Sequence, residues 1–104
     1  MRRTETRKSV ERGAAVLTLH YGNEKWLDRI RLQDLDLSNA EYCILGQLEG
    51  GYLEGRNAVA LTLLGVGVHA DTYGFEKPES KTYRFYNTLT QTWKKFIKER
   101  RAAR

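Results

Sequence analysis

Apolar residues recur at helical spacing near the start of the chain. Val10, Ala14, Leu17 and Tyr21 step by four, three and four positions. Side chains at this spacing lie on one face of a helix. The pattern predicts an amphipathic helix over about residues 9–20.

Gly22 and Asn23 follow this helix and predict its end, because glycine and asparagine favour a helix stop. Asn23 can also cap a short segment that carries Trp26 and Leu27. Apolar and polar residues then mix over residues 30–37. A short strand is one interpretation, but no partner strand is evident, so we expect an extended connector.

Ser38 and Glu41 have the spacing of a capping box and predict a helix start at Ser38. Cys43, Leu45 and Leu48 follow in helical register, and Gly50-Gly51 predicts the end of the helix. A mid-helix glycine, Gly46, predicts close packing of another helix.

A further helix is predicted over residues 52–64, with Leu53 and Val59 among its apolar positions. Gly55 is a weak point and favours a late start near Arg56. Residues 65–70 are ambiguous between a frayed helix end and an extended piece, and residues 71–80 read as a loop containing Gly74 and Pro78.

The last helix has the clearest pattern. Its apolar positions step by three, four, three and one, at Tyr86, Leu89, Trp93, Phe96 and Ile97. The fold class predicted is therefore all-α, a small single-domain bundle of four to five helices. We expect its core to contain Leu45, Leu48, Leu63, Leu89, Trp93 and Ile97.

Composition limits the class of protein. A chain of 104 residues with 40% apolar residues can form one domain with a modest core. The single cysteine excludes an intramolecular disulfide, and no stretch has the length and apolarity of a membrane span. We expect a protein of a reducing cytoplasm.

Charge is concentrated at the two ends of the chain. Residues 1–8 carry a net charge of +3 and residues 94–104 a net charge of +5, whereas the 85 residues between them carry −3. The pattern predicts a disordered basic arm over 1–8 and a helical domain over 9–104 whose last helix ends in cations.

No residue pattern typical of catalysis, metal or cofactor binding is present. Cys43 has no nearby histidine in the sequence and is expected to be a buried, dispensable hydrophobe. His20 fits the end of a helix, and His69 a loop or helix end. The glycine-rich stretches match no phosphate-binding or dinucleotide fingerprint. We therefore expect that the protein is not an enzyme and that it binds no cofactor.

Several blocks resemble a set of small helical proteins encoded by actinobacteriophages and by actinobacterial prophages. The resemblance covers about residues 13–101. Its distinctive parts are Cys43-Ile-Leu-Gly-Gln-Leu48 and the Leu-Thr-x-x-Trp block that ends at Trp93. Many of these proteins carry a second cysteine where this chain has Ala40, so a Cys-x-x-Cys role is absent here. The resemblance implies a viral or prophage origin and a small helical fold, and it implies no activity.

Two binding functions remain open, both in a bacterial host cell. The first is an accessory protein that binds a host or phage protein through exposed aromatic residues. The candidates are Tyr52, Tyr73, Phe75, Tyr83 and Phe85. The alternative is a nucleic-acid-binding regulator, which requires both basic ends on one face. Its candidate contacts are Arg2, Arg3, Lys94, Lys95, Lys98, Arg100 and Arg101. We favour protein binding because the middle of the chain is acidic.

Overall fold

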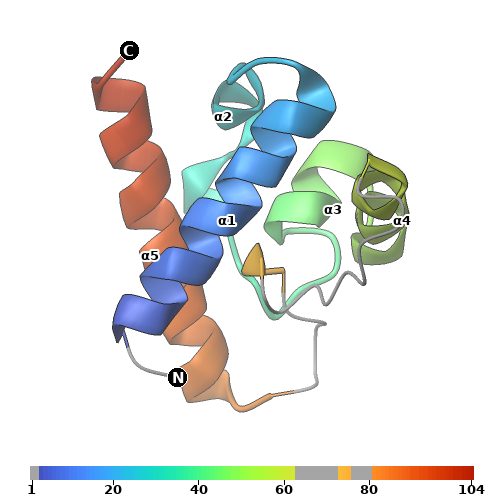
Figure 1. Cartoon of the computed structure of the whole chain (residues 1–104). Helices are drawn as coiled ribbons and strands as arrows, with labels where there is room; N and C mark the ends of the chain where they lie inside the picture. Colours follow the sequence, from blue (N-terminus) through green and yellow to red (C-terminus); the bar gives the residue numbers. More distant parts are fainter. Residues whose placement is uncertain (1–2, 63–72, 76–80) are drawn as a thin grey trace.

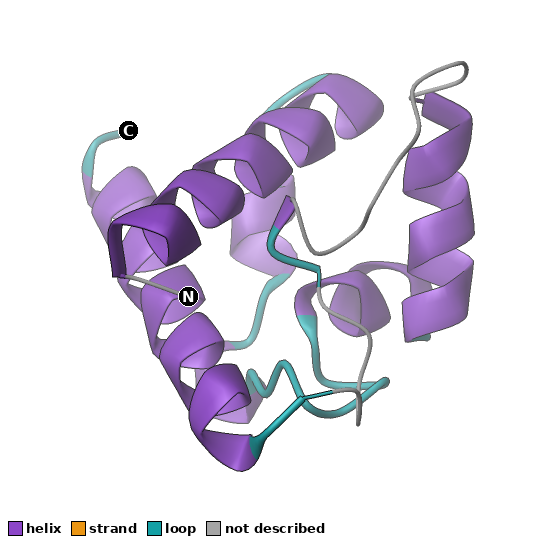
Figure 2. Ribbon diagram, turned by 60° about the horizontal axis from the view of Figure 1, so that its bottom comes forward, coloured by secondary structure: helices purple, strands orange, loops and turns teal. Residues whose placement is uncertain are grey.

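The computed structural model describes residues 3–62, 73–75 and 81–104. Within these residues the chain forms five α-helices and a 3₁₀ turn (Figure 1). Helices and loops account for all of this described part, and no strand occurs in it (Figure 2). The predicted all-α class is confirmed. The radius of gyration of 12.4 Å fits a single domain, for which this length gives about 13 Å.

Two long helices form one side of the molecule. α1 (Arg3–Tyr21) lies against α5 (Tyr83–Ala102), and the two run in the same direction (Figure 1). The predicted apolar face of α5 is buried along its whole length. The hydroxyl oxygen of Thr82 caps this helix by accepting the backbone N–H of Phe85 at 3.2 Å.

The start of α1 differs from the predicted disordered arm over 1–8, because residues 3–8 are helical. Contacts with α5 supply the order that the local sequence lacks. The Thr6 side chain is buried. Arg7 pairs with Glu99 at 2.7 Å and lies over the ring of Phe96, with 5.1 Å from its guanidinium carbon to the ring centroid. Tertiary packing, and not propensity, therefore sets where this helix begins.

The predicted stop after α1 is confirmed. Gly22 has a φ of +80°, and its N–H donates to the Thr18 carbonyl at 2.9 Å. The side chain of Asn23 accepts the N–H of Lys25 at 2.8 Å and leads into α2 (Trp26–Arg29). The connector after α2 is extended at both ends, as expected, with a short 3₁₀ turn, η1 (Leu32–Asp34), inside it.

The capping box predicted at Ser38 and Glu41 is wrong. The Ser38 N–H and hydroxyl both donate to Asp36, which holds the segment in a turn. α3 (Ile44–Glu49) begins later, and its cap is the Cys43 thiol, which accepts the N–H of Gly46 at 3.3 Å. Gly46 makes the predicted close approach, but its neighbour is the turn and not another helix: an added Cβ would lie 2.2 Å from the Ala40 carbonyl oxygen.

α4 (Tyr52–Thr62) begins at Tyr52 and not near Arg56. Gly55 is a contact with α3 and not a weak point, because a Cβ there would lie 2.5 Å from the Cβ of Leu45. Leu53, placed by the sequence on the apolar face, is 58% exposed. The closely packed glycine explains this difference, since it turns the helix so that its Gly55 side faces α3.

The core surrounds Trp93, which is fully buried. Its indole N–H donates to the Gly74 carbonyl at 2.8 Å, and its ring stacks on Phe75 with the centroids 5.6 Å apart. Residues 73–75 pass close to α1. A Cβ added at Gly13 would lie only 2.0 Å from the backbone carbonyl oxygen of Tyr73. The expected core residues Leu45, Leu48, Leu89, Trp93 and Ile97 are buried, and Leu63 lies outside the described residues.

Candidate functional site

The five aromatic residues predicted to bind a partner do not form an exposed patch. Tyr52 and Phe75 are buried, and the Tyr52 hydroxyl donates to the Phe75 carbonyl at 3.0 Å. Tyr73 and Phe85 are half-buried and pack against the core. Only Tyr83, at the start of α5, is largely exposed, at 84%. The prediction is wrong for the buried pair, because Tyr52 of α4 and Phe75 are part of the hydrophobic core.

The two basic ends of the chain come together only in part, because Arg7 pairs with Glu99 at 2.7 Å and lines a groove together with Lys95. Because α1 and α5 run in the same direction, the start of α1 and the end of α5 lie at opposite ends of the helix pair (Figure 1). Arg2 and the side chain of Arg3 lie outside the described residues. Nucleic-acid binding through both basic ends therefore stays a prediction.

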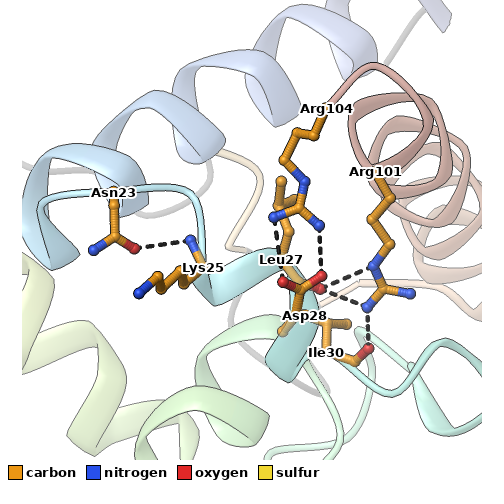
Figure 3. A network of polar contacts seen from close by, with 7 residues as sticks. All are labelled: Asn23, Lys25, Leu27, Asp28, Ile30, Arg101 and Arg104. Atoms are coloured by element: carbon orange, nitrogen blue, oxygen red, sulfur yellow. Dashed lines mark hydrogen bonds and ion pairs between the residues drawn. The ribbon is translucent and has the colours of Figure 1, made fainter.

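Three arginines at the end of α5 contact the segment around α2, and we name them the arginine clamp: Arg100, Arg101 and Arg104. Arg100 pairs with Glu24. Arg104 contacts both carboxylate oxygens of Asp28, at 2.5 and 3.2 Å (Figure 3). Arg100 and Arg101, proposed from sequence as nucleic-acid contacts, are thus engaged within the fold.

Arg101 is the central member of the clamp. Its Nε and one terminal nitrogen donate to the Leu27 carbonyl at 3.0 and 2.5 Å, and the same terminal nitrogen donates to the Ile30 carbonyl at 2.6 Å (Figure 3). α2 has only four residues, so the carbonyls at its end have no partner within the helix. Arg101 satisfies two of them and fixes α2 against α5.

The Asp28 carboxyl group should titrate below its ordinary range. The hydrogen bonds from Arg104 are the main cause of the lowered pKa of Asp28. Folding therefore gains stability from this pair above the unfolded-state pKa of about 3.9, and the gain is lost as the pH falls through the lower folded-state pKa. In an NMR titration of the side-chain carboxyl carbons, Arg104→Gln should return the Asp28 midpoint toward its ordinary value. An identical midpoint in both proteins would contradict the pairing.

A second polar cluster joins the ends of α1 and α3. The Tyr21 hydroxyl donates to Glu49 at 2.5 Å, and His20 lies 4.0 Å from the same carboxylate oxygen. Arg29 lies over the Tyr21 ring and donates to the Leu48 carbonyl at 2.7 Å. Burial, followed by the bond to Glu49, raises the pKa of Tyr21. These groups hold one another in place and tie the two helix ends together.

Cys43 is buried, as predicted, and burial raises the pKa of its thiol. Both effects suppress the reactive thiolate. We expect a thiol reagent at neutral pH to label the native protein far more slowly than the denaturant-unfolded protein. Labelling at equal rates would show that the thiol is accessible. His20 lies in the last turn of α1, as expected, while His69 lies outside the described residues.

The solvent-facing side of α5 carries a line of polar and basic residues spaced by four, three, four and three positions. We name it the α5 stripe: Arg84, Thr88, Gln91, Lys95 and Lys98. Residues 83–98 contain four cations and no acidic residue. The stripe borders a groove of about 490 Å³ between α5 and α1, and the residues that line it are all of polar or charged types: Arg7, Asn87, Thr88, Gln91, Thr92 and Lys95.

Another recess, of about 410 Å³, lies between α1, α2 and α5. Trp26 and Phe96 form part of its wall, but both side chains are buried. Of its charged residues, Glu24 and Arg100 pair with each other, and Glu11 pairs with Arg7. The groove beside the stripe is therefore the better candidate for a ligand, because more of its polar groups are unmatched.

Sequence reasoning named Lys95 and Lys98 but missed the rest of this surface. The four-three spacing from Arg84 to Lys98 was readable in the sequence. The contribution of Arg7 was not, because it depends on how α1 packs against α5. In the described part of the chain no group of three potential metal ligands occurs, and none of the described helices has the length and apolarity to cross a membrane.

The comparisons with known proteins add no relative. No protein-family model matches the chain, and neither a curated protein nor a solved structure matches it.

Proposed function

We propose that this chain is a phage- or prophage-derived accessory protein that acts in the cytoplasm of a bacterial host by binding a host or phage protein. The observation that carries the proposal is the groove between α1 and α5, where Asn87, Gln91 and Lys95 have no side-chain partner among the described residues. Exposed polar side chains that line a groove and have no partner within the fold are available to bind another molecule. The free thiol of Cys43 fits a reducing compartment.

A binding role is favoured over catalysis by the way the ionisable groups are used. Tyr21, Glu49 and Arg29 lie together but contact one another. Catalysis requires an acid, base or nucleophile that converges on an open position for substrate. The Cys43 thiol, buried and with a raised pKa, does not supply a nucleophile.

Nucleic-acid binding is the second candidate, and the α5 stripe is the observation that favours it. Its three cations, Arg84, Lys95 and Lys98, have no acidic residue between them in the sequence and could contact phosphates. One observation weighs against it, namely that the arginine clamp at the end of α5 is engaged within the fold.

Site-specific photo-crosslinking tests the proposed function. A photoreactive amino acid replaces Gln91 in the groove or, as a control, exposed Asn57 on α4, and each protein is irradiated in a lysate of an actinobacterial host. We expect a discrete protein adduct from position 91 that position 57 does not give. Adducts with nucleic acid alone, or identical adducts from both positions, would overturn the proposal.

A further inference from the structure

We infer that the groove between α1 and α5 binds an acidic segment of a partner protein along the α5 stripe. The inference rests on the proposed protein-binding function and specifies the chemistry of the partner. It is carried by three features of the described residues, namely the charge of the stripe, the unmatched polar groups of the groove and the mixture of donors and acceptors there.

The charge of the stripe is not neutralised within the fold. Arg84, Lys95 and Lys98 are exposed, and none of them forms an ion pair among the described residues. This differs from the clamp at the end of the same helix, where Arg100 and Arg104 pair with carboxylates. A line of uncompensated cations attracts an anionic partner.

The groove beside these cations offers amide and hydroxyl groups. The Asn87 and Gln91 side chains each present a donor and an acceptor, and neither is used among the described residues. Thr92 donates its hydroxyl to the Thr88 carbonyl at 2.7 Å, which leaves its oxygen free to accept. A ligand in this groove therefore meets both kinds of hydrogen-bonding group.

This mixture favours a peptide over a nucleic-acid backbone. A peptide backbone has N–H donors and carbonyl acceptors that can pair with Asn87 and Gln91, and its acidic side chains can pair with Lys95. A phosphate backbone presents acceptors alone, which would leave the side-chain oxygens of the groove without partners. Exposed aromatic rings on which bases could stack are also missing from the residues that line the groove.

The number and spread of the cations fit a short segment. Arg84 and Lys98 are separated by fourteen residues, or about 21 Å along a helix at 1.5 Å per residue. An extended peptide of about six or seven residues spans this distance at about 3.3 Å each. A protein that binds duplex DNA mainly through phosphates makes about 6–10 contacts to them. The three cations of the stripe and Arg7 provide fewer.

Fluorescence anisotropy with labelled probes tests the inference. The probes are a seven-residue peptide rich in glutamate, the same peptide with glutamine in place of glutamate, and a 20-base-pair DNA duplex. The stripe variant is Lys95→Gln with Lys98→Gln. Its matched control is Lys25→Gln with Arg56→Gln, which removes two exposed cations from elsewhere on the surface. Equal urea midpoints for both variants and the wild type establish that the fold is intact.

We expect the acidic peptide to bind the wild type and the control equally, and to bind the stripe variant about tenfold more weakly. The glutamine peptide should not bind. Equal weakening in both variants, no binding of the acidic peptide, or tighter stripe-dependent binding of the duplex would each overturn the inference. If the acidic peptide fails while position 91 still crosslinks to a protein, the proposed function stands and only the acidic nature of the partner is wrong.

Discussion

Replacing Trp93 by alanine should lower the free energy of unfolding by about 3–5 kcal/mol, the range for truncating a buried aromatic residue. The side chain is fully buried, stacks on Phe75 and meets Trp26 and Phe96 edge-on. The substitution also removes the indole donor from the Gly74 carbonyl. Small domains have only about 5–15 kcal/mol of stability, so this loss approaches unfolding. Urea denaturation followed by circular dichroism measures it.

Two further variants separate packing from hydrogen bonding at this position. Trp93→Phe keeps an aromatic ring but not the donor, and should cost less than Trp93→Ala. Tyr83→Ala removes an aromatic residue that is 84% exposed in the same helix, and should change stability by no more than about 0.5 kcal/mol. A Trp93→Ala protein with the wild-type midpoint would show that the core is not centred on this residue.

Replacing Arg101 by methionine should lower the free energy of unfolding by about 1.5–3 kcal/mol. Methionine keeps an unbranched apolar stem, but it leaves the Leu27 and Ile30 carbonyls without the charged donor that satisfies them. Hydrogen bonds to charged groups contribute about 1.5–3 kcal/mol, and unsatisfied acceptors are costly. Chemical denaturation of the purified variant gives the value.

The control for Arg101 lies three residues earlier in the same helix. Lys98 is exposed and has no ion pair among the described residues, so Lys98→Met should change stability by about 0.5 kcal/mol or less. Equal losses for Lys98→Met and Arg101→Met would contradict the clamp. The difference matters for function, because a variant that replaces all the basic residues of α5 would confuse loss of binding with loss of fold.

The sequence predicted the long helices well because their apolar spacing and stop signals are local. The face of α5 from Tyr86 to Ile97, the stop at Gly22 and the stop at Gly50 are all where the pattern indicated. Each of these features depends on residues within a few positions of one another, so tertiary context was not needed to read them.

The errors have a common physical cause, which is contact between distant segments. Ser38 is bound to Asp36 in a turn, so the helix begins instead at the Cys43 cap. Residues 3–8 are helical because α5 packs beside them. Tyr52 and Phe75 are buried because they meet each other across 23 positions. Composition could not show which aromatic residues or which cations would find partners inside the fold.

The same cause limited the candidate site. The charge of the C-terminal segment was evident, but its division into two groups was not. Arg101 and Arg104 bind the segment around α2, whereas Lys95 and Lys98 remain available on the stripe. Only the packing of α2 against α5 separates them.

This division of the cations is tested most directly by comparing two triple variants in one urea denaturation experiment. One carries Arg100→Gln, Arg101→Gln and Arg104→Gln, and the other carries Arg84→Gln, Lys95→Gln and Lys98→Gln. Both lower the formal net charge of +5 by three, and glutamine is a good helix former at the five substituted positions that lie within α5. The clamp variant should lose at least about 2 kcal/mol, and the stripe variant should stay within about 1 kcal/mol of the wild type. Equal losses, or a larger loss in the stripe variant, would contradict the assignment of one group to the fold and the other to binding.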